Sequence, residues 1–318
     1  MRILASDYQR LVSNDIDLSD ARILVLADHL NGFTEMYGNE ILKYLEAIHF
    51  SKPIQTEYVF DDILSEKYNL LDISFSPTLK DDVDLCHFHN YTTHPTKCFK
   101  NFLCSFNGSD HVGRQLLTSI LHKFNLFNPT YSSKNFTSNM DDVHGHLVNL
   151  NLTANQQKLY YRFFVNDLDF LSNVCSFGHV QYDHANNIYN LETKITESFV
   201  HIVSETMSTS YYPFVTEKFL YSIVTRGLFV ANAQPNWHSH VEKYYGFKKY
   251  NKIFDYSFDS IQNPIERIIK MMEMVLKFSK LSIHDWDDLY LMEQDTIEYN
   301  YDHYFSKRYM EHLKKYEN

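Results

Sequence analysis

Short runs of consecutive apolar residues recur along the chain and predict strands. The clearest runs are Ala21–Asp28, Asn101–Asn107, Phe199–Ser204 and Leu228–Ala233, with Tyr58–Leu64 and Val83–His89 as weaker candidates. Because apolar and polar residues do not alternate strictly within the clearest runs, these runs are typical of strands covered on both faces, as in parallel sheets. The pattern therefore favours a buried parallel sheet.

Between the runs, apolar residues recur at intervals of three and four, which predicts helices. The predicted helices are Gly38–Phe50, His111–Phe124, Thr216–Arg226 and Asn263–Ser279. We expect Thr216 to cap the third helix and Gly227 to stop it, and the Asn-Pro step at Asn263 is a strong start signal for the fourth. We interpret Asn125–Ala154 as loop and Asp285–Asn318 as one or two closing helices. The alternation of strands and helices indicates an α/β fold, in which ligands bind at the carboxyl ends of parallel strands.

Composition narrows the class of protein. The chain has 318 residues and a formal net charge of −11, and its clusters of Lys and Arg are short. Proteins that grip a nucleic-acid backbone usually carry a basic surface, so nucleic acid is disfavoured as a partner, although it stays open as an acceptor. No apolar run reaches the roughly 20 residues needed to span a bilayer, and the first residues do not resemble a signal peptide. We therefore expect a cytoplasmic protein without a transmembrane segment.

The densest polar chemistry lies in Val203–Lys218, after a predicted strand and at the start of a predicted helix. Free backbone N–H groups and the positive end of the helix dipole suit such a position to a diphosphate. Lys218 supplies a cation for phosphates, Glu217 can accept both hydroxyls of a ribose, and Phe214 can stack on a base. The alternative interpretation is an ordinary helix cap with an acidic first turn.

A motif that resembles the donor-binding motif of the α-1,3-fucosyltransferases lies at Phe214–Lys218, preceded by Ser204-Glu205-Thr206. In that family a Phe-Glu-Asn-Ser segment leads to Tyr-Val-Thr-Glu-Lys, then to a helix, a glycine and an apolar strand. The matching run here ends at Ala233-Gln234-Pro235. Upstream, Phe102–Arg114 is similar to the family's strand, turn and helix-start arginine.

The resemblance implies a GT-B-like α/β fold, in which two Rossmann-like domains face each other across a cleft. We accordingly expect an N-terminal acceptor domain at 1–95, a sugar-nucleotide-binding domain at 96–282 and closing helices at 283–318. The implied activity is that of an inverting glycosyltransferase, which moves a sugar from a nucleotide-sugar donor to a hydroxyl of a glycan acceptor. No metal is obligatory in this chemistry, because cationic side chains neutralise the phosphates.

The resemblance also assigns the donor-binding residues, which are Asn107, Arg114, Phe214, Thr216, Glu217 and Lys218. Among them Glu217 would bind the ribose, Lys218 and Arg114 the phosphates, and Phe214 would stack near the base. Glu205 would lie at the sugar-facing end of its strand as a candidate catalytic carboxylate. Phe214 stands where the family has tyrosine, so the donor sugar and nucleobase stay open, with a GDP-sugar as the first expectation.

Direct displacement needs a carboxylate that removes the proton from the acceptor hydroxyl. We expect this base in the N-terminal domain, where Asp28 and Glu35 lie at and after the end of the first predicted strand. His238 follows the last predicted strand, and there it could contact donor or acceptor. Asp167-Leu168-Asp169 matches the Asp-x-Asp pattern of metal-dependent glycosyltransferases, but such triplets arise readily among 40 acidic residues.

Two other functions stay open at this point. One is a glycosyltransferase that modifies hydroxylated bases in viral DNA, and the other is a non-catalytic module that binds sugar nucleotides. The sequence does not indicate the oligomeric state.

Overall fold

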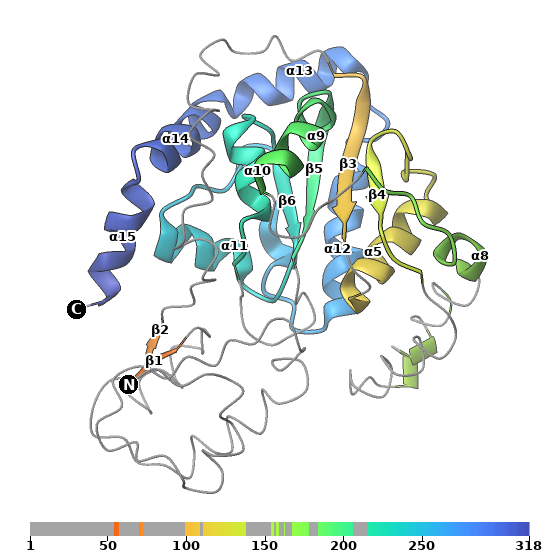
Figure 1. Cartoon of the computed structure of the whole chain (residues 1–318), viewed down its shortest axis with the longest axis horizontal. Coiled ribbons are helices and arrows are strands. Elements are labelled where there is room, and N and C mark those ends of the chain that lie inside the picture. The colour runs from red at the N-terminus through yellow and green to blue at the C-terminus, as the bar shows by residue number, and fades with distance from the viewer. Residues whose placement is uncertain are drawn as a thin grey trace, which may run out of the picture.

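Figure 1 shows the computed structural model of the chain. It describes residues 54–56, 70–72, 99–108, 111–137, 167–177, 184–205 and 215–317, with a few helical residues between 154 and 162. Asp28, Glu35 and Phe214 lie outside the described residues, as do the strands and the helix predicted before residue 99. The fold below is therefore that of the part of the chain from residue 99 onwards, apart from one short pair of strands.

A four-stranded sheet forms the centre of this part (Figure 1), and its strands are β3 (Asn101–Asn107), β4 (Ser132–Lys134), β5 (Ser198–Ser204) and β6 (Phe229–Asn232). Their order is β4-β3-β5-β6, and every pairing is parallel. β1 (Ile54–Thr56) and β2 (Leu70–Asp72) form a separate parallel pair. The α/β class and three predicted strands are confirmed, whereas β4 contradicts the interpretation of its stretch as loop.

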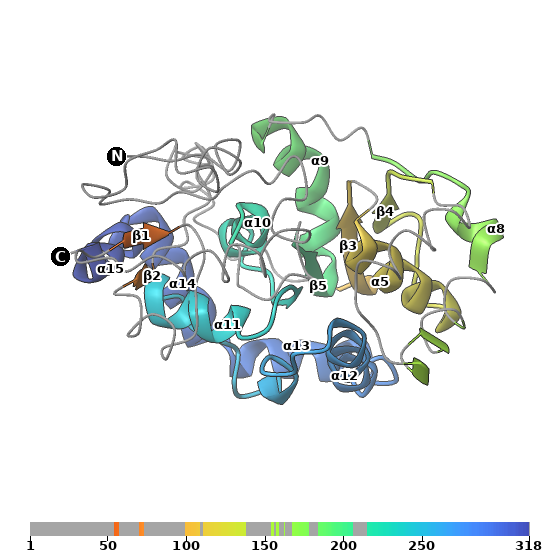
Figure 2. The ribbon, with the colours of Figure 1, turned by 90° about the horizontal axis from the view of Figure 1, so that it is seen from below.

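Helices cover both faces of the sheet. The helices of this part of the chain are α5 (Val112–Lys123), α8 (Leu168–Leu171), α9 (His184–Thr196), α10 (Lys218–Val224), α11 (Trp237–His240), α12 (Pro264–Leu276), α13 (Ile283–Met292), α14 (Gln294–Phe305) and α15 (Arg308–Glu317). Of these, α8 packs on α5 and α15 packs on α14. A π-helical turn, η4 (Val241–Tyr245), and a 3₁₀ turn, η5 (Tyr256–Phe258), complete the set. Figure 2 separates α9 and α10 on one face from α12 on the other, and α5 packs against α12.

The strand order creates a topological switch point between β3 and β5. From β3 the chain passes through α5 to β4 on one side, whereas β5 and β6 add to the other side of β3. At such a point the connections leave in opposite directions, and a crevice opens at the carboxyl ends of the two strands. The fold thus selects the ends of β3 and β5 as the place to look for a ligand site.

Local sequence signals explain some helix ends and not others. Asn263 caps α12 as predicted, because its side chain accepts hydrogen bonds from two backbone N–H groups of the first turn. Thr216 does not cap α10, because its hydroxyl is used elsewhere, and the predicted cap is wrong. α10 ends at Val224, and Arg226 rather than Gly227 adopts the left-handed conformation. Gly227 serves close packing instead, since a Cβ there would lie 2.8 Å from Ile195 Cγ2.

The C-terminal part forms three helices, where one or two were expected. Arg226, just after α10, anchors α14 to the sheet. Its Nε donates to both carboxylate oxygens of Glu298, at 2.9 and 3.1 Å, and its guanidinium lies 3.5 Å from the ring centre of Tyr301. The hydroxyl of Tyr290 on α13 donates to the Arg226 carbonyl at 2.9 Å. α13 and α14 are therefore fixed to the same turn that leads into β6.

Candidate functional site

The residue after β5, Glu205, is fully buried and organises the start of α10. Its Oε1 accepts a hydrogen bond from the backbone N–H of Thr216 at 3.1 Å, and its Oε2 accepts one from the Thr216 hydroxyl at 2.5 Å. The Thr216 oxygen in turn accepts a hydrogen bond from Lys218 Nζ at 3.0 Å. A continuous chain of hydrogen bonds therefore runs from the lysine through the threonine to the carboxyl group.

Glu217 stands beside this chain. Its Oε1 lies 3.5 Å from Lys218 Nζ, and its side chain is 11% exposed, against 26% for Lys218. Glu217 is therefore nearly buried, whereas Lys218 is partly exposed. Within the trio of Glu205, Glu217 and Lys218, Lys218 has the most exposed side chain and carries the positive charge.

Burial raises the pKa of Glu205 above its ordinary value, and the nearby charge of Glu217 acts in the same direction. The ammonium of Lys218 and the hydrogen bonds from Thr216 oppose this effect without cancelling it. Since both oxygens of Glu205 are engaged by Thr216, its geometry suits it to hold Lys218 in place. The pKa of Tyr221 on α10 is also raised, mainly by burial.

Arg114 lies in the first turn of α5 and connects this helix to the end of β5. It is buried, and its Nη2 donates to the carbonyl of Ser204 at 3.3 Å, next to Glu205. From β6, Asn232 Nδ2 donates to the carbonyl of Gly113 at 3.0 Å. The start of α5 carries no acidic residue and no side-chain cap. The positive end of its dipole therefore adds to the charge of Arg114.

The carboxyl edge of the sheet also carries buried polar atoms without a hydrogen-bond partner among the described residues. They are Asn107 Oδ1 at the end of β3, Ser204 Oγ at the end of β5, Asn232 Oδ1 at the end of β6, and both amide atoms of Gln234 just beyond. Each buried polar group left unpaired costs about 1–3 kcal/mol. Such a concentration of unpartnered polar atoms at one edge of the sheet is typical of a ligand-binding site, where a ligand supplies the missing hydrogen bonds.

The structure brings together most of the predicted donor-binding residues. Arg114, Thr216, Glu217, Lys218 and Glu205 form one contiguous group at the ends of neighbouring strands. Asn107 ends β3, the strand beside β5, and its Nδ2 donates to Ser105 Oγ and the Ser133 carbonyl.

Sequence reasoning missed Ser204, Asn232 and Gln234 as site residues. Each lies at or just past the end of a predicted strand, and this position was the signal that could have identified them.

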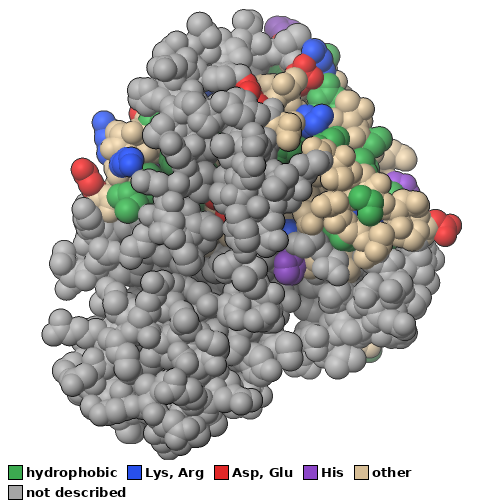
Figure 3. All heavy atoms as spheres, in the orientation of Figure 1, with side chains coloured by type: hydrophobic (Ala, Val, Ile, Leu, Met, Phe, Trp, Pro, Cys, Tyr) green, Lys and Arg blue, Asp and Glu red, His purple; other side chains and the backbone are tan. Residues whose placement is uncertain are grey.

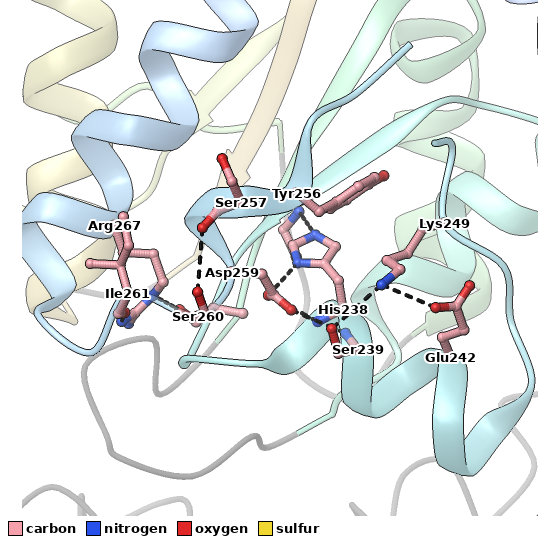
Figure 4. Close-up of polar contacts among 12 residues, drawn as sticks. His238, Ser239, Glu242, Lys249, Tyr256, Ser257, Asp259, Ser260, Ile261 and Arg267 are labelled. Atoms are coloured by element: carbon pink, nitrogen blue, oxygen red, sulfur yellow. Dashed lines mark hydrogen bonds and ion pairs between the residues drawn. The ribbon is translucent and has the colours of Figure 1, made fainter. Parts of the chain in front are cut away.

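The expected contact of His238 with a ligand is not what the structure shows. His238 is buried, its Nδ1 donates to Asp259 Oδ1 at 2.7 Å, and its Nε2 accepts the backbone N–H of Ala231 at 2.9 Å (Figure 4). Asp259 also accepts the N–H groups of His238 and Ser239, at 3.1 Å each. Both ring nitrogens are thus consumed in holding the turn after β6.

Arg267 on α12 extends this cluster. Its Nε donates to the Ala233 carbonyl at 2.9 Å, and its Nη1 donates to the carbonyls of Ile261 and Gln262. Burial alone would raise the pKa of Asp259, but His238 and the backbone N–H groups outweigh burial and lower it. Burial lowers the pKa of Arg267 to about 10. We call His238, Asp259 and Arg267 the β6 anchor.

The Asp167 triplet also has a structural role. Asp167 is buried, accepts a hydrogen bond from Ser119 Oγ at 3.1 Å and lies 2.7 Å from His122 Nδ1. These contacts attach the segment before α8 to α5. Asp169 is exposed.

Comparison with known proteins identifies no relative. No family model matches the chain, and no curated protein or solved structure matches it either. Among the described residues, no helix combines the length and apolar character required to cross a membrane. The functional argument therefore depends on the geometry of the carboxyl edge.

Proposed function

We propose that the protein is an inverting glycosyltransferase that moves a sugar from a nucleotide-sugar donor to an acceptor hydroxyl. The observation that carries the proposal is the contiguous group at the switch point. Arg114 contacts the end of β5, Glu205 follows that end directly, and Thr216 connects Glu205 to Lys218. Two cations and a ribose-binding carboxylate candidate thus lie at the edge where open parallel sheets bind nucleotides.

The donor would lie along this group. Lys218 and Arg114 suit the two phosphates, because charge-assisted hydrogen bonds to phosphate are strong, and the positive end of the α5 dipole acts in the same direction. The carboxylate of Glu217 suits the paired hydroxyls of a ribose. Glu205 acts as a positioning residue, since it holds the Thr216 hydroxyl that receives Lys218.

In the proposed reaction, these cations stabilise the leaving group. A bond forms between the acceptor oxygen and the anomeric carbon, the bond from that carbon to the phosphate oxygen breaks, and the nucleoside diphosphate leaves with the electron pair. Preorganised positive groups stabilise the charge that develops on the departing phosphate. The acceptor proton passes to a carboxylate, for which we propose Asp28 or Glu35 in a facing domain of GT-B type.

The acceptor is proposed to be a glycan in the cytoplasm, and the donor a GDP-sugar. The net charge of −11 disfavours a DNA acceptor. On the face in Figure 3, basic and acidic side chains of the described residues are scattered among apolar and neutral ones, which gives no reason to prefer DNA.

The first test measures nucleotide binding by thermal shift and by calorimetry, with GDP, UDP, ADP and their sugar conjugates as ligands. We expect one nucleoside diphosphate to stabilise the wild type. Lys218→Ala should weaken its binding by about 10- to 100-fold, because a charge-assisted contact is lost. Lys270→Ala is the matched control, since Lys270 is an exposed lysine that pairs only with Glu273 at 3.0 Å in the described contacts. Failure of every nucleotide to bind would contradict the proposal.

Turnover separates an enzyme from a binding module. Incubation with the stabilising sugar nucleotide and a panel of glycan acceptors should release the diphosphate and give a product of inverted anomeric configuration by NMR. A protein that binds the donor but transfers its sugar neither to these glycans nor to hydroxymethylated DNA would instead be a non-catalytic module.

A further inference from the structure

Three of the unpartnered oxygens form one row across the sheet. Ser204 pairs with Asn232 in the register of β5 and β6. The register of β3 and β5 pairs Ser105 with Ile202, and two residues further on it places Asn107 opposite Ser204. Equivalent positions on neighbouring parallel strands point their side chains to the same face, about 4.8 Å apart. Asn107, Ser204 and Asn232 therefore form what we call the oxygen row.

Each member of the oxygen row is more than nine-tenths buried, with exposures of 0%, 1% and 2% in the order given. In the described part of the chain, Asn107 Oδ1, Ser204 Oγ and Asn232 Oδ1 have no hydrogen-bond partner. The amide nitrogens of the two asparagines are already used, by Ser105, Ser133 and Gly113. The row consequently presents oxygens that need hydrogen-bond donors, with the Ser204 hydroxyl also able to donate.

The position of the row relative to the cations decides which part of a ligand it meets. Asn232 contacts the carbonyl of Gly113 in the first turn of α5, and Arg114 contacts the carbonyl of Ser204. The row thus adjoins the arginine, whereas Glu217 adjoins Lys218 at the start of α10. A donor with its ribose at Glu217 and its diphosphate between the cations would direct the group beyond the phosphates toward the row.

We infer that the oxygen row binds the hydroxyl groups of the transferred sugar. A hydroxyl is the matching chemistry, because it donates to an amide oxygen and also accepts from a serine. This inference rests on the proposed function and assigns the sugar-selecting part of the same site to Ser204, Asn232 and Asn107.

The test compares each sugar nucleotide with its own nucleoside diphosphate by calorimetry, using GDP-fucose, GDP-mannose, UDP-glucose and UDP-N-acetylglucosamine. For the donor that binds, the sugar should tighten binding by about tenfold or more, as expected for one or more hydrogen bonds to buried partners. Ser204→Ala should remove about tenfold of this gain while it leaves the affinity for the diphosphate within about twofold. Asn232→Ala should also reduce the gain, which provides a second variant.

Ser222→Ala is the matched control. Ser222 is a buried serine on α10, but its hydroxyl lies 2.7 Å from His201 Nδ1 and is therefore partnered. This variant should lose stability and keep the gain from the sugar. Donors that lack one sugar hydroxyl sharpen the test. A donor without the hydroxyl that faces Ser204 should bind the wild type more weakly than the complete donor does. Ser204→Ala should bind the two donors equally well.

The outcomes separate the two proposals. Diphosphate binding without a gain from the sugar, or a gain that survives in both row variants, overturns the inference and leaves the proposed function standing. A wild type that binds no nucleotide overturns both. Ordered waters that stay on the row in a crystal structure with bound donor would likewise overturn the inference, because the row would then be hydrated and not sugar-binding.

Discussion

Two buried polar regions lie at neighbouring places in this fold, and they differ in how completely they are satisfied. In the β6 anchor, both ring nitrogens of His238 and both carboxylate oxygens of Asp259 have partners within the chain (Figure 4). In the oxygen row, Asn107, Ser204 and Asn232 each keep one oxygen unpartnered among the described residues. A satisfied network stabilises its own fold, whereas an unsatisfied one carries a cost that a ligand can relieve.

This difference indicates which buried polar residues are candidates for contact with a ligand. His238 had the more suggestive chemistry in the sequence, because histidine is a frequent catalytic residue. Its contacts nevertheless assign it to the scaffold. Ser204 and Asn232 were not among the residues that the sequence suggested as candidates, yet each keeps an unpartnered oxygen at the edge where parallel sheets bind ligands. Whether a buried polar side chain has all its hydrogen-bond partners separates structural residues from candidate site residues better here than the residue type does.

The largest effect should come from breaking the β6 anchor. Asp259→Ala leaves His238 and two backbone N–H groups without their acceptor in a buried site, and we expect a loss of about 3–5 kcal/mol in the free energy of unfolding. Urea denaturation at pH 7 measures it. Asp255→Ala is the control, since Asp255 accepts from Ser257 in an exposed turn and should cost far less. Similar losses in the free energy of unfolding for both variants would contradict the stabilising role of the β6 anchor.

The next effect concerns a buried histidine, His201, whose charged form is disfavoured by burial. Burial lowers the pKa of His201 to about 3, and its Nδ1 pairs with Ser222 Oγ. The unfolded chain takes up the proton first, near pH 6.5, so the contribution of His201 to stability is present above that pH and is lost as the pH falls toward 3. Between pH 7 and pH 5 this amounts to about 2 kcal/mol.

The measurement is the difference in free energy of unfolding between pH 7 and pH 5, compared in wild type and His201→Gln. The variant should lose about 2 kcal/mol less than the wild type over this interval. Other groups, including Glu205 with its raised pKa, contribute equally to both proteins and cancel. Equal losses in the two proteins would show that His201 is not the group that titrates.

The smallest effect is predicted beside the oxygen row. Gln234→Leu replaces an amide whose two polar atoms have no partner among the described residues by an apolar group of similar size. Because no hydrogen bond is lost, the free energy of unfolding should stay within about 1 kcal/mol of the wild type, or rise. Chemical denaturation without ligand is the readout. A loss as large as that of Asp259→Ala would mean that Gln234 is held by contacts of the kind seen in the anchor.

The sequence predicted the three strands of the central sheet that consist largely of apolar residues. The apolar runs that ended at Asn107, Ser204 and near Asn232 all became parallel strands. β4 was missed because its three residues, Ser132–Lys134, contain no apolar side chain and depend on pairing with β3. Tertiary context overrides local pattern in such short edge strands.

The sequence placed several of the candidate site residues at one strand end, where the fold brings them together, but it did not predict their contacts. The motif around Glu217 and Lys218 placed the cations and acids at a strand end, and the fold brings Arg114 to the same place. The sequence cannot show that the Thr216 hydroxyl donates to Glu205 instead of capping α10. Such choices between a local and a long-range partner are made only when the sheet has formed.

The central pairing of the sheet also determines when the site can exist. β3 and β5 join residues that lie 97 positions apart, as in the hydrogen bond from Ser105 Oγ to the Ile202 carbonyl. Closing so large a loop is entropically costly and slows folding. Arg114 and Ser204 come within reach of each other only after that closure, so a refolding chain should gain binding competence and its central sheet in one late step.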